Sequence, residues 1–585
     1  MNSLATLHPC TSCMQQLTRI PVMLTLFALT TWTSAQELVW ARAVGAQGDD
    51  VAQSLAVDLD GNVIVAGYFE GTVDLDPGMG QEFHTSSGAN DIFVQKLDSA
   101  GALVWGWGLG GTDADYPTGL STDADANIYV CGTFNGIVDF DPAAGVTELA
   151  STGGYDIFFA KYDAEGAFVW ARGCGSAGYD EPKSVAVGPL GSVYLLSYFS
   201  ATIDADPGAA LLPIMSAGAL DILVQRFDAD GGLLWANSIG SAGTDLGLSM
   251  ALDADENIWF TGSFENTLDM DPGIAAFPLT SAGAWDIFVA KWSAGGAFLW
   301  AGRTGGVENF DTGYDIAVDA DGNAVVVGSF FGTGDFDPGA GEFPLTASSL
   351  GSDEIFVQKL DANGAFLWAV SMGGTDADLA YGVALEADGR IDVTGFFSGT
   401  ADFDPHPFEV FEMTTASPAN FFDSYLVELS ANGDMISAWQ FGGANSISTQ
   451  SIARGSDDAV FIAGQFENTP DFDPATGQVI LGSAGFRDAF IIRLEALPTG
   501  ISVHHSAGKP ALYPNPALDH VWLEVDVDLV GSPYVVCDQL GRVVAQGRLE
   551  AQRTSLSVDG FATGMYHVDL LHGAVGATFT VVRSQ

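Results

Sequence analysis

Basic residues are scarce in this chain: 19 Lys and Arg stand against 74 Asp and Glu, which leaves a formal charge of −55 over 585 residues. This deficit excludes nucleic acid as a natural partner, because phosphate binding needs a basic surface. It disfavours an anionic membrane surface for the same reason. Hydrophobic residues nevertheless make up 47% of the chain and charged ones only 16%, which excludes a disordered protein. The bulk of the chain is expected to fold around a sizeable core.

Cysteine, long apolar runs and helical heptads are also lacking. Five Cys are too few for a disulfide scaffold in a chain of this length. The 72 Gly and 38 Phe stand among short alternating apolar runs, a pattern that favours an all-β fold. Beyond residue 35, no stretch approaches the ~18 uncharged apolar residues of a membrane-spanning helix. No transmembrane segment is therefore expected in the mature chain.

The first 35 residues have the pattern of a secretory signal peptide. Arg19 precedes the apolar run 20–29, and the small residues Thr33 and Ala35 stand before Gln36. We expect cleavage after Ala35, with Met14 as an alternative start. The mature chain is then exported to an oxidising compartment. There it retains three thiols, which allow at most one bridge within the chain: Cys131, Cys174 and Cys537.

A repeat of about 65 residues runs through most of the chain. Trp recurs once in each unit: Trp40, Trp105, Trp170, Trp235, Trp300, Trp368 and Trp439. The tetrapeptide Asp-x-Asp-Pro also occurs seven times, each time at a fixed distance behind a Phe. The stretch that follows it differs in length between units, which indicates a surface loop.

Each repeat unit contains four strand patterns, which in the second unit are residues 119–122, 128–134, 156–162 and 167–172. Four strands in a unit of this length are typical of a β-propeller blade. One position of the first strand is always small: Ala56, Ser121, Ala186, Ala251, Ala317, Ala384 and Ala453. We expect this strand innermost, where only small side chains fit at the axis, and the Trp strand outermost.

The two ends of the repeat region complement each other. The last unit ends at residues 488–494 without a Trp strand, and the mature chain begins with an unpartnered one at 37–45. Pairing of these segments would close the ring and remove an exposed sheet edge. The expectation is a seven-bladed propeller over residues 36–495. Its units resemble the SBBP family of propeller repeats, as in GGTDADYPTGLSTDADANIYVCGTF, although Asp-Phe-Asp-Pro stands where that family more often has Asp-Phe-Pro. The resemblance implies a fold and not a function.

A second, smaller domain is predicted behind the repeats. Residues 496–512 are a linker rich in Pro and Gly, and alternating strands over 513–585 predict a small Ig-like β-sandwich. Its opening Tyr513-Pro514-Asn515-Pro516 and its strand start at Gly564 resemble the C-terminal type A sorting domain of type IX secretion. The resemblance implies the type IX machinery as a partner and an address outside a Gram-negative cell, released or attached to its surface. An accessory Ig-like module is the alternative.

The Asp-x-Asp-Pro pairs are the candidate metal site. Residues i and i+2 of an extended strand project the same way, and Ca²⁺ favours carboxylate ligands in flexible loops. The structural alternative is that these Asp side chains cap backbone N–H groups in a turn. The candidate ligands are Asp74, Asp76, Asp139, Asp141, Asp204, Asp206, Asp269, Asp271, Asp335, Asp337, Asp402, Asp404, Asp471 and Asp473. No other cofactor is expected.

Two function classes remain open from the sequence. No nucleophile, base and orienting residue stand together in a recognisable motif, and the prominent acids recur in most units. This favours a secreted, monomeric, non-enzymatic propeller that binds a glycan, a protein or a cell surface. The alternative is an exported polysaccharide hydrolase or lyase with Asp or Glu as acid and base. Arg454 replaces the Val, Leu or Thr of other units; it either faces the channel or marks an imperfect terminal repeat.

Overall fold

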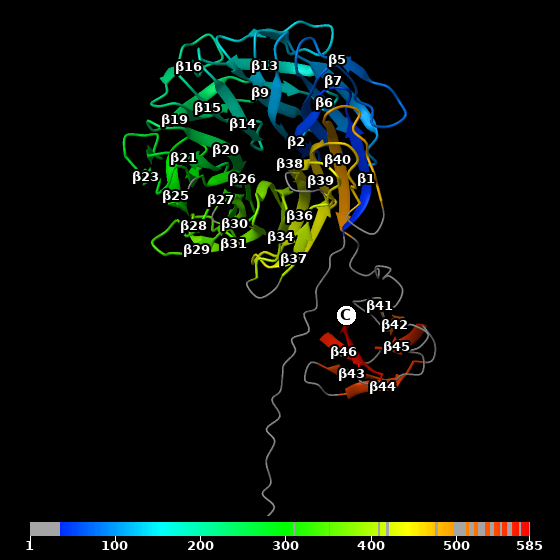
Figure 1. Cartoon of the computed structure of the whole chain (residues 1–585). Helices are drawn as coiled ribbons and strands as arrows, with labels where there is room; N and C mark the ends of the chain where they lie inside the picture. Colours follow the sequence, from blue (N-terminus) through cyan, green and yellow to red (C-terminus); the bar gives the residue numbers. More distant parts are fainter. Residues whose placement is uncertain are drawn as a thin grey trace, which may run out of the picture.

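The computed structural model describes residues 36–307, 310–349, 351–406, 410–416, 421–473 and 478–496, together with the strands between 511 and 583. From Gln36 to Ala496 these residues form seven four-stranded antiparallel blades arranged around a central axis (Figure 1). The first full blade contains β2, β3, β6 and β7 from the axis outward, and blades 2 to 6 repeat this order. The all-β, seven-bladed architecture expected from the repeat is confirmed.

The four strand layers can be followed around the ring. The innermost strands are β2 Val51–Val57, β8 Tyr116–Thr122, β14 Asp180–Val187, β20 Asp245–Leu252, β26 Thr312–Val318, β32 Leu379–Leu385 and β38 Ile447–Arg454. The second strands are β3 Val63–Phe69, β9 Ile128–Phe134, β15 Val193–Phe199, β21 Ile258–Phe264, β27 Ala324–Phe330, β33 Ile391–Phe397 and β39 Val460–Phe466. The third strands are β6 Asp91–Leu97, β12 Asp156–Tyr162, β18 Asp221–Phe227, β24 Asp286–Trp292, β30 Glu354–Leu360, β36 Asp423–Leu429 and β40 Asp488–Ala496.

The outermost strands carry the repeated Trp, as expected. They are β7 Leu103–Leu109, β13 Phe168–Cys174, β19 Leu233–Ile239, β25 Phe298–Gly306, β31 Phe366–Gly374, β37 Met435–Phe441 and β1 Gln36–Val44. The indole N–H reaches the next blade: Trp40 donates to the Ser99 carbonyl at 3.0 Å, and Trp105 donates to the Ala164 carbonyl at 3.2 Å. Trp170, Trp235 and Trp368 make the same contact. The repeated Trp therefore ties each of these blades to its neighbour.

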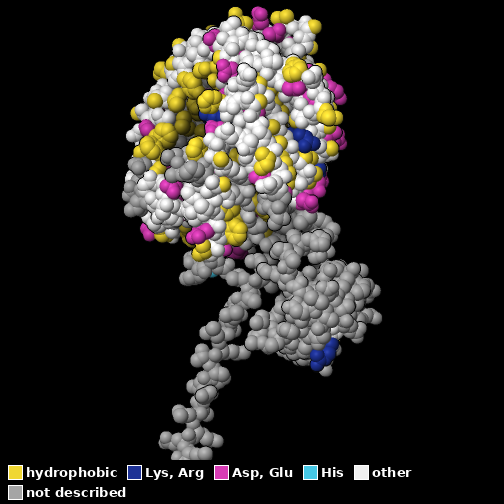
Figure 2. Space-filling model, turned by 45° about the vertical axis from the view of Figure 1, so that its right-hand side comes forward, with side chains coloured by type: hydrophobic (Ala, Val, Ile, Leu, Met, Phe, Trp, Pro, Cys, Tyr) yellow, Lys and Arg dark blue, Asp and Glu magenta, His cyan; other side chains and the backbone are white. Residues whose placement is uncertain are grey.

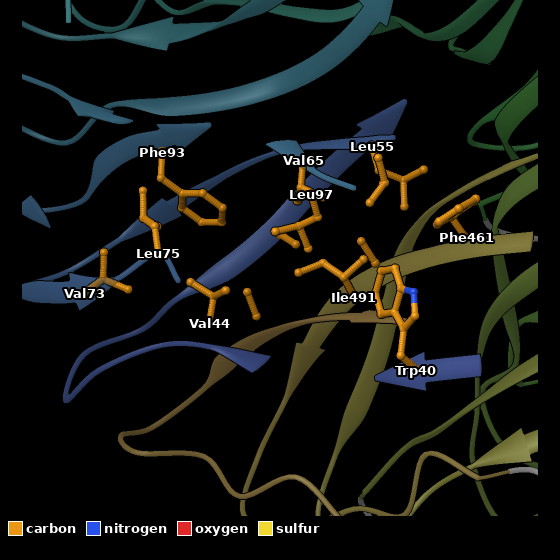
Figure 3. Packing of buried hydrophobic residues seen from close by; sticks show 14 of the residues in the cluster. Trp40, Val44, Leu55, Val65, Val73, Leu75, Phe93, Leu97, Phe461 and Ile491 are labelled. Carbon is orange, nitrogen blue, oxygen red and sulfur yellow. The ribbon is translucent and has the colours of Figure 1, made fainter. Parts of the chain in front are cut away.

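The ring closes in the way that its two ends predict. β1 pairs antiparallel with β40, with Gln36 opposite Ala496 and Val44 opposite Ala489, so the first strand of the chain completes blade 7. Figure 3 shows the core beside this joint, in which Trp40 and Ile491 of blade 7 lie near Leu55 of blade 1. Each of the clusters between blades is a buried apolar core of this kind. Closure removes the sheet edge that an open propeller would expose.

The small residues identified in the sequence lie on the innermost strands, but they do not line the axis. Ala56 and Ala453 pack against the apolar clusters between blades. The positions at the axis stand two residues earlier and are also small in six blades: Ser54, Gly119, Ser184, Ser249, Gly382 and Ser451, with Asp315 in blade 5. Small residues therefore do stand at the axis in six blades, as expected, but two positions before the one that the sequence predicted.

The Asp-x-Asp-Pro motif forms the corner of a short rim hairpin behind the second strand. In blade 1 this hairpin consists of β4 Thr72–Asp74 and β5 Phe83–Thr85. Asp74 Oδ1 accepts the backbone N–H of Asp76 at 3.1 Å and that of Glu82 at 2.8 Å. The residue between the two Asp is fully buried in every blade: Leu75, Phe140, Ala205, Met270, Phe336, Phe403 and Phe472.

Blade 6 departs from the charge pattern of the other blades at the hairpin turns opposite the rim hairpins. In blade 1, Lys96 of the third strand pairs with Asp58 of the first turn at 2.8 Å. Blades 2, 4 and 5 repeat this Lys–Asp pair. In blade 6 the position of the Lys holds Glu428, which lies beside Asp392 and the turn residue Glu386.

Arg454 of blade 7 supplies part of the missing positive charge. Its Nε donates to Asp392 Oδ2 at 2.5 Å, and its guanidinium also pairs with Glu386. Arg390 of blade 6 pairs with Glu386 and Glu428. Arg454 thus joins two blades through a buried ion network and is not among the residues that line the channel. It marks neither a channel site nor a merely imperfect repeat.

The remaining described strands belong to the C-terminal segment. β41 Ala511–Tyr513, β42 His520–Glu524 and β45 Arg553–Ser557 form one sheet. β43 Pro533–Asp538, β44 Val543–Arg548, β46 Gly564–His572 and β47 Val575–Arg583 form a second. Among the residues that the structure describes, no helix is long and apolar enough to cross a membrane. The signal peptide predicted at 1–35 and most of the linker predicted at 496–512 lie outside the described residues.

Two of the three mature thiols can be assessed. Cys131 of β9 and Cys174 of β13 are free and buried. Burial raises the pKa of each thiol to about 12, so both remain protonated at neutral pH. A protonated, buried thiol is a poor nucleophile and a poor metal ligand. Neither residue is a candidate for redox chemistry.

Candidate functional site

One end of the propeller brings two kinds of loop together. The connections between blades and the rim hairpins both lie at the end of the blades where the innermost strands begin and the second strands finish. We call this end the loop face. Positions that repeat from blade to blade alternate here with positions that differ, and the two sets have different structural roles.

The repeated positions on the loop face satisfy the backbone at the joints between blades. Each of six innermost strands begins at or next to a buried Asp: Asp50, Asp115, Asp180, Asp245, Asp311 and Asp378. Asp115 is typical, since its carboxylate accepts the N–H of Gly111 at 2.7 Å and that of Asn135 at 3.0 Å. Burial raises the pKa of Asp115 to about 7 and that of Asp378 to about 8. These carboxyl groups are structural, because the fold uses both oxygens in five of the six and Oδ2 in Asp50.

The differing positions arise from a β-bulge in every innermost strand. The register between first and second strands shifts once per blade, for example between Ala52 and Ser54. The residue inside the shift has no partner in the ladder and turns toward the axis. These bulge residues are Gln53, Thr118, Lys183, Leu248, Tyr314, Tyr381 and Gln450. Seven equivalent positions thus carry five residue types with polar, charged, apolar and aromatic side chains.

All seven bulge residues line one cavity of about 400 Å³ on the axis. The residue behind each bulge also lines this space. In blades 3 and 7 it is a Ser whose hydroxyl joins the innermost strands of neighbouring blades. Ser451 accepts the N–H of Leu55 at 3.1 Å, and Ser184 accepts that of Met250 at 3.3 Å. The cavity therefore has a rigid floor of backbone and small hydroxyls below a ring of dissimilar side chains. A rigid framework that carries variable side chains is typical of a binding site.

Blade 3 places a charged cluster in this cavity. Lys183 Nζ lies 2.6 Å from Glu181 Oε1, and the hydroxyl of Tyr179 donates to Glu181 Oε2 at 2.7 Å. Tyr198 also donates to Glu181 and lies beneath the Lys183 ammonium, which is 5.6 Å from its ring centroid. Burial raises the pKa of Glu181, but Lys183 and the hydrogen bonds outweigh it and hold that pKa below its usual value. Glu181 is a fixed, ionised carboxylate at neutral pH.

Blade 5 places a second carboxyl group in the cavity. Asp315 Oδ1 accepts the hydroxyl of Ser249 at 2.6 Å, and Oδ2 accepts the N–H of Val383 at 2.8 Å. Burial raises the pKa of Asp315 to about 6. The cavity therefore holds two acids whose protonation differs, Glu181 ionised and Asp315 partly protonated at mildly acidic pH.

Aromatic rings lie in two runs on the propeller, and the second of them lines the cavity. The first crosses blades 1 to 3, where Tyr116 lies 5.0 Å from Tyr68 and 6.1 Å from Tyr155 between ring centroids. The second lies on blades 5 and 6, where Tyr381 is 5.0 Å from Tyr314. Figure 2 shows hydrophobic side chains, a class that includes Tyr, gathered in a hollow of the propeller surface. Aromatic rings beside polar groups can bind a ligand that is partly apolar and partly hydrogen-bonding.

A smaller pocket of about 290 Å³ opens beside the cavity, between blades 6 and 7. Tyr381, Phe396 and Phe422 of blade 6 form its aromatic side. Gln450, Gln465, Glu467 and Arg487 of blade 7 form its polar side. Tyr381 and Gln450 also line the axial cavity, so the two spaces are contiguous.

The Asp-x-Asp-Pro pairs do not line either space. In all seven blades the first Asp accepts the N–H of the second Asp and an N–H farther along the hairpin. These bonds are those of the structural alternative. Among the described residues, no group of three or more His, Cys, Asp or Glu side chains is placed to hold a metal ion. Calcium binding at these pairs stays a prediction.

The sequence analysis missed the residues of the cavity, although the repeat contained a signal for them. The bulge position stands three residues before the small position of the innermost strand, and its residues differ in chemistry from blade to blade. Alignment of the seven units on their Asp-x-Asp-Pro motifs would have marked this position. The search for repeated acids passed over it.

Comparison with known proteins identifies the C-terminal segment. Residues 511–581 match the family model of the secretion system C-terminal sorting domain. The chain is therefore exported through a C-terminal sorting domain of the type IX system, and its address is the cell exterior or the outer surface. The expectation drawn from Tyr513-Pro514-Asn515-Pro516 is confirmed, whereas the SBBP assignment of the repeats stays a resemblance.

The propeller has more distant similarities. An uncharacterised WD repeat-containing protein of Acanthamoeba polyphaga mimivirus is 22% identical over 523 residues, which cover 74% of this chain and 36% of that protein. The regulatory protein FlaEY of Caulobacter vibrioides is 31% identical over 126 residues, which cover 22% of this chain and 13% of that protein. This chain thus spans only about a third of the length of the mimivirus protein and a smaller share of FlaEY.

Solved structures give weak matches. Sqt1 from Chaetomium thermophilum aligns with a TM-score of 0.35 at 10% identity, over 79% of this chain and all of that one. PorZ, a surface component of the type IX secretion system of Porphyromonas gingivalis, aligns with a TM-score of 0.20 at 11% identity, over 93% of this chain and all of that one. Neither similarity carries a functional argument.

Proposed function

We propose that this exported propeller is a non-enzymatic binding module that holds an extracellular glycan on its loop face. One observation carries the proposal: the positions that differ between blades converge on the axial cavity, whereas the repeated positions serve the backbone. Seven copies of one unit would otherwise build a symmetric channel. The departure from symmetry is concentrated where a ligand could be contacted.

The chemistry of the lining supports a carbohydrate. Gln53, Thr118 and Gln450 offer amide and hydroxyl groups that donate and accept hydrogen bonds, and Tyr314 and Tyr381 offer aromatic rings beside them. Sugars present apolar C–H faces together with many hydroxyl groups, which suits such a mixture. The acidity of the surface disfavours polyanions, as the composition already indicates.

The test is a glycan array probed with the full chain and with variants of one cavity aromatic. We expect Tyr314→Ala to lose most of the binding. Phe83→Ala is the matched control, because Phe83 is 58% exposed on a rim hairpin and lies outside the cavity. Binding that is absent from the wild type, or that Phe83→Ala weakens as much as Tyr314→Ala does, would contradict the proposal.

A polysaccharide hydrolase or lyase is the second candidate, and the carboxyl pair in the cavity favours it. Glu181, ionised, and Asp315, with its raised pKa, have the difference in protonation that acid–base catalysis uses. Both Asp315 oxygens are nevertheless engaged by Ser249 and Val383, which suits a structural group better. Release of reducing or unsaturated ends from the array's ligands, lost in Asp315→Asn and in Glu181→Gln, would establish this candidate instead.

A further inference from the structure

We propose that the pocket between blades 6 and 7 binds one pyranose ring that carries no anionic group. The inference rests on the proposed function, because it assigns a sugar class and a place to the glycan that the loop face would hold. It adds a site that is built from two blades.

The size and the aromatic side of the pocket suit a single sugar ring. Its volume of about 290 Å³ is at the lower end of small-molecule sites. The ring centroids of Phe396 and Phe422 are 4.4 Å apart, and those of Tyr381 and Phe396 are 5.5 Å apart, so the three rings form a continuous wall. The C–H groups of a pyranose carry partial positive charge and pack favourably on the negative faces of such rings.

The polar side of the pocket suits hydroxyl groups. Glu467 can only accept hydrogen bonds when ionised, Arg487 can only donate them, and Gln465 can do both. A pair of neighbouring sugar hydroxyls can therefore donate to the carboxylate and accept from the guanidinium at the same time. The Arg487 guanidinium is only loosely engaged within the protein, since its Nη1 lies 3.4 Å from Gln465 Oε1. Its donors remain available to a ligand.

The charges around Arg487 argue against an anionic ligand. Its Nε lies 3.8 Å from Asp49 Oδ1 and 3.9 Å from Glu467 Oε1. Two carboxylates and one guanidinium leave a formal local charge of −1, which repels an anionic sugar. The same charge does not oppose a cationic sugar, such as an amino sugar. The charges therefore exclude sugars that carry a carboxylate and accept those that do not.

Equivalent positions elsewhere in the ring provide the controls. Glu467 follows the last Phe of its second strand, and Glu70 occupies the same position in blade 1. Glu70 is exposed and lies outside both spaces. Glu70→Gln and Glu467→Gln are therefore the same chemical change at equivalent places in two blades, and only the second alters the pocket.

The experiment measures binding of methyl glycosides to the full chain by saturation-transfer NMR and calorimetry. The probes are the methyl glycosides of glucose, galactose and mannose, followed by the uronic acid and amino-sugar counterparts of the tightest binder. We expect at least one neutral glycoside to bind, its uronic acid counterpart to bind about tenfold more weakly, and its amino-sugar counterpart to bind at least as tightly as the neutral ring. Glu467→Gln should weaken binding about tenfold through loss of a charged hydrogen bond, whereas Glu70→Gln should leave it unchanged. Arg487→Met gives a second variant should Glu467→Gln fold poorly.

The proposal is overturned if none of the three neutral glycosides binds, if the uronic acid counterpart binds as tightly as the neutral ring, or if Glu70→Gln weakens binding as much as Glu467→Gln. These failures are distinguishable from failure of the proposed function. If the array binds the chain through Tyr314 while the methyl glycosides do not bind, the pocket assignment alone is wrong. If the array shows no binding at all, both are wrong.

Discussion

Removal of Arg454 tests whether the ion network between blades 6 and 7 stabilises the joint between them. The side chain is 9% exposed and contacts Asp392 and Glu386, whose side chains are 0% and 2% exposed. Truncation to the Leu that blade 4 has at this position leaves three buried acids to a single Arg390. Breaking a buried ion pair by removal of one partner costs about 3–5 kcal/mol. We expect Arg454→Leu to lower the melting temperature by about 5 °C or more at pH 8.

The loss should depend on pH in a direction that the pKa shifts fix. Burial raises the pKa of Glu386 to about 7 and that of Asp392 to about 6. Both exceed the values of the unfolded chain, so the folded state holds these protons more tightly, and its stability falls as the pH rises through this range. Removal of Arg454 destabilises the ionised forms of Glu386 and Asp392 further. The deficit of the variant should therefore be smallest near pH 5 and largest above pH 7.

Two further variants make the experiment specific. Arg172→Leu removes a cation that hydrogen-bonds only to backbone carbonyls at the surface, and it should melt close to the wild type. A triple variant, Arg454→Leu with Asp392→Tyr and Glu428→Lys, restores the pattern of blade 2, where Lys161 lies 4.9 Å from the ring centroid of Tyr129. It should regain most of the lost stability. If Arg454→Leu melts like the wild type at pH 8, or the triple variant melts no higher than the single one, the network does not stabilise this joint.

Four other outcomes are expected. Deletion of residues 36–44 should expose an edge of β40 and give an aggregating propeller, which light scattering and calorimetry would detect; an unchanged transition would contradict closure by β1. A chain that ends at Ala496 should melt as the full propeller does but remain in the periplasm of its native cell, and efficient secretion would refute the role of the tail. Millimolar Ca²⁺ should raise the melting temperature more than Mg²⁺ does at matched ionic strength. An equal response of the wild type and of the double variant Asp139→Asn/Asp141→Asn would mean that this Asp pair only stabilises the turn. Asp378, whose pKa burial raises to about 8, contributes stability that is lost as the pH rises through that value, so Asp378→Asn should flatten the pH dependence of melting between pH 6 and 9.

The fold could be predicted because each of its main features repeats seven times. In blade 2, the strands expected at 128–134 and 156–162 have these bounds in the structure, as β9 and β12. The outer position of Trp170 and the closing role of residues 37–45 also followed from the spacing alone. Alternation of apolar residues fixes strand faces locally, and repetition removes the ambiguity that a single strand would leave.

The site could not be predicted from the same alternation, because a bulge interrupts it. At Gln53 or Tyr381 the strand gains one residue, so the side chain that strict alternation would assign to a face instead points to the axis. The seven residues at the bulge do not share one chemical property, so no single unit reveals the bulge. Only comparison of the seven units marks its position. The sequence also does not indicate that Arg454 forms an ion pair with Asp392. The two residues belong to different blades and meet only across a joint of the closed ring.

Repetition and function are inversely related in this chain. An acid that recurs in most blades meets a need that most blades have, as Asp115 does when it accepts two backbone N–H groups at a joint. Residues that repeat identically in seven blades cannot select one ligand, because the ligand could bind to them in seven equivalent ways. Selectivity requires a position whose backbone is already satisfied, so that the side chain is free to differ. The bulge residues are free to differ in this way, since they lie outside the strand ladder. In blades 3 and 7, Ser184 and Ser451 behind the bulge join the inner ring instead. The residues to be mutated first are therefore those on which the repeats disagree, with Tyr314 in the cavity at their head.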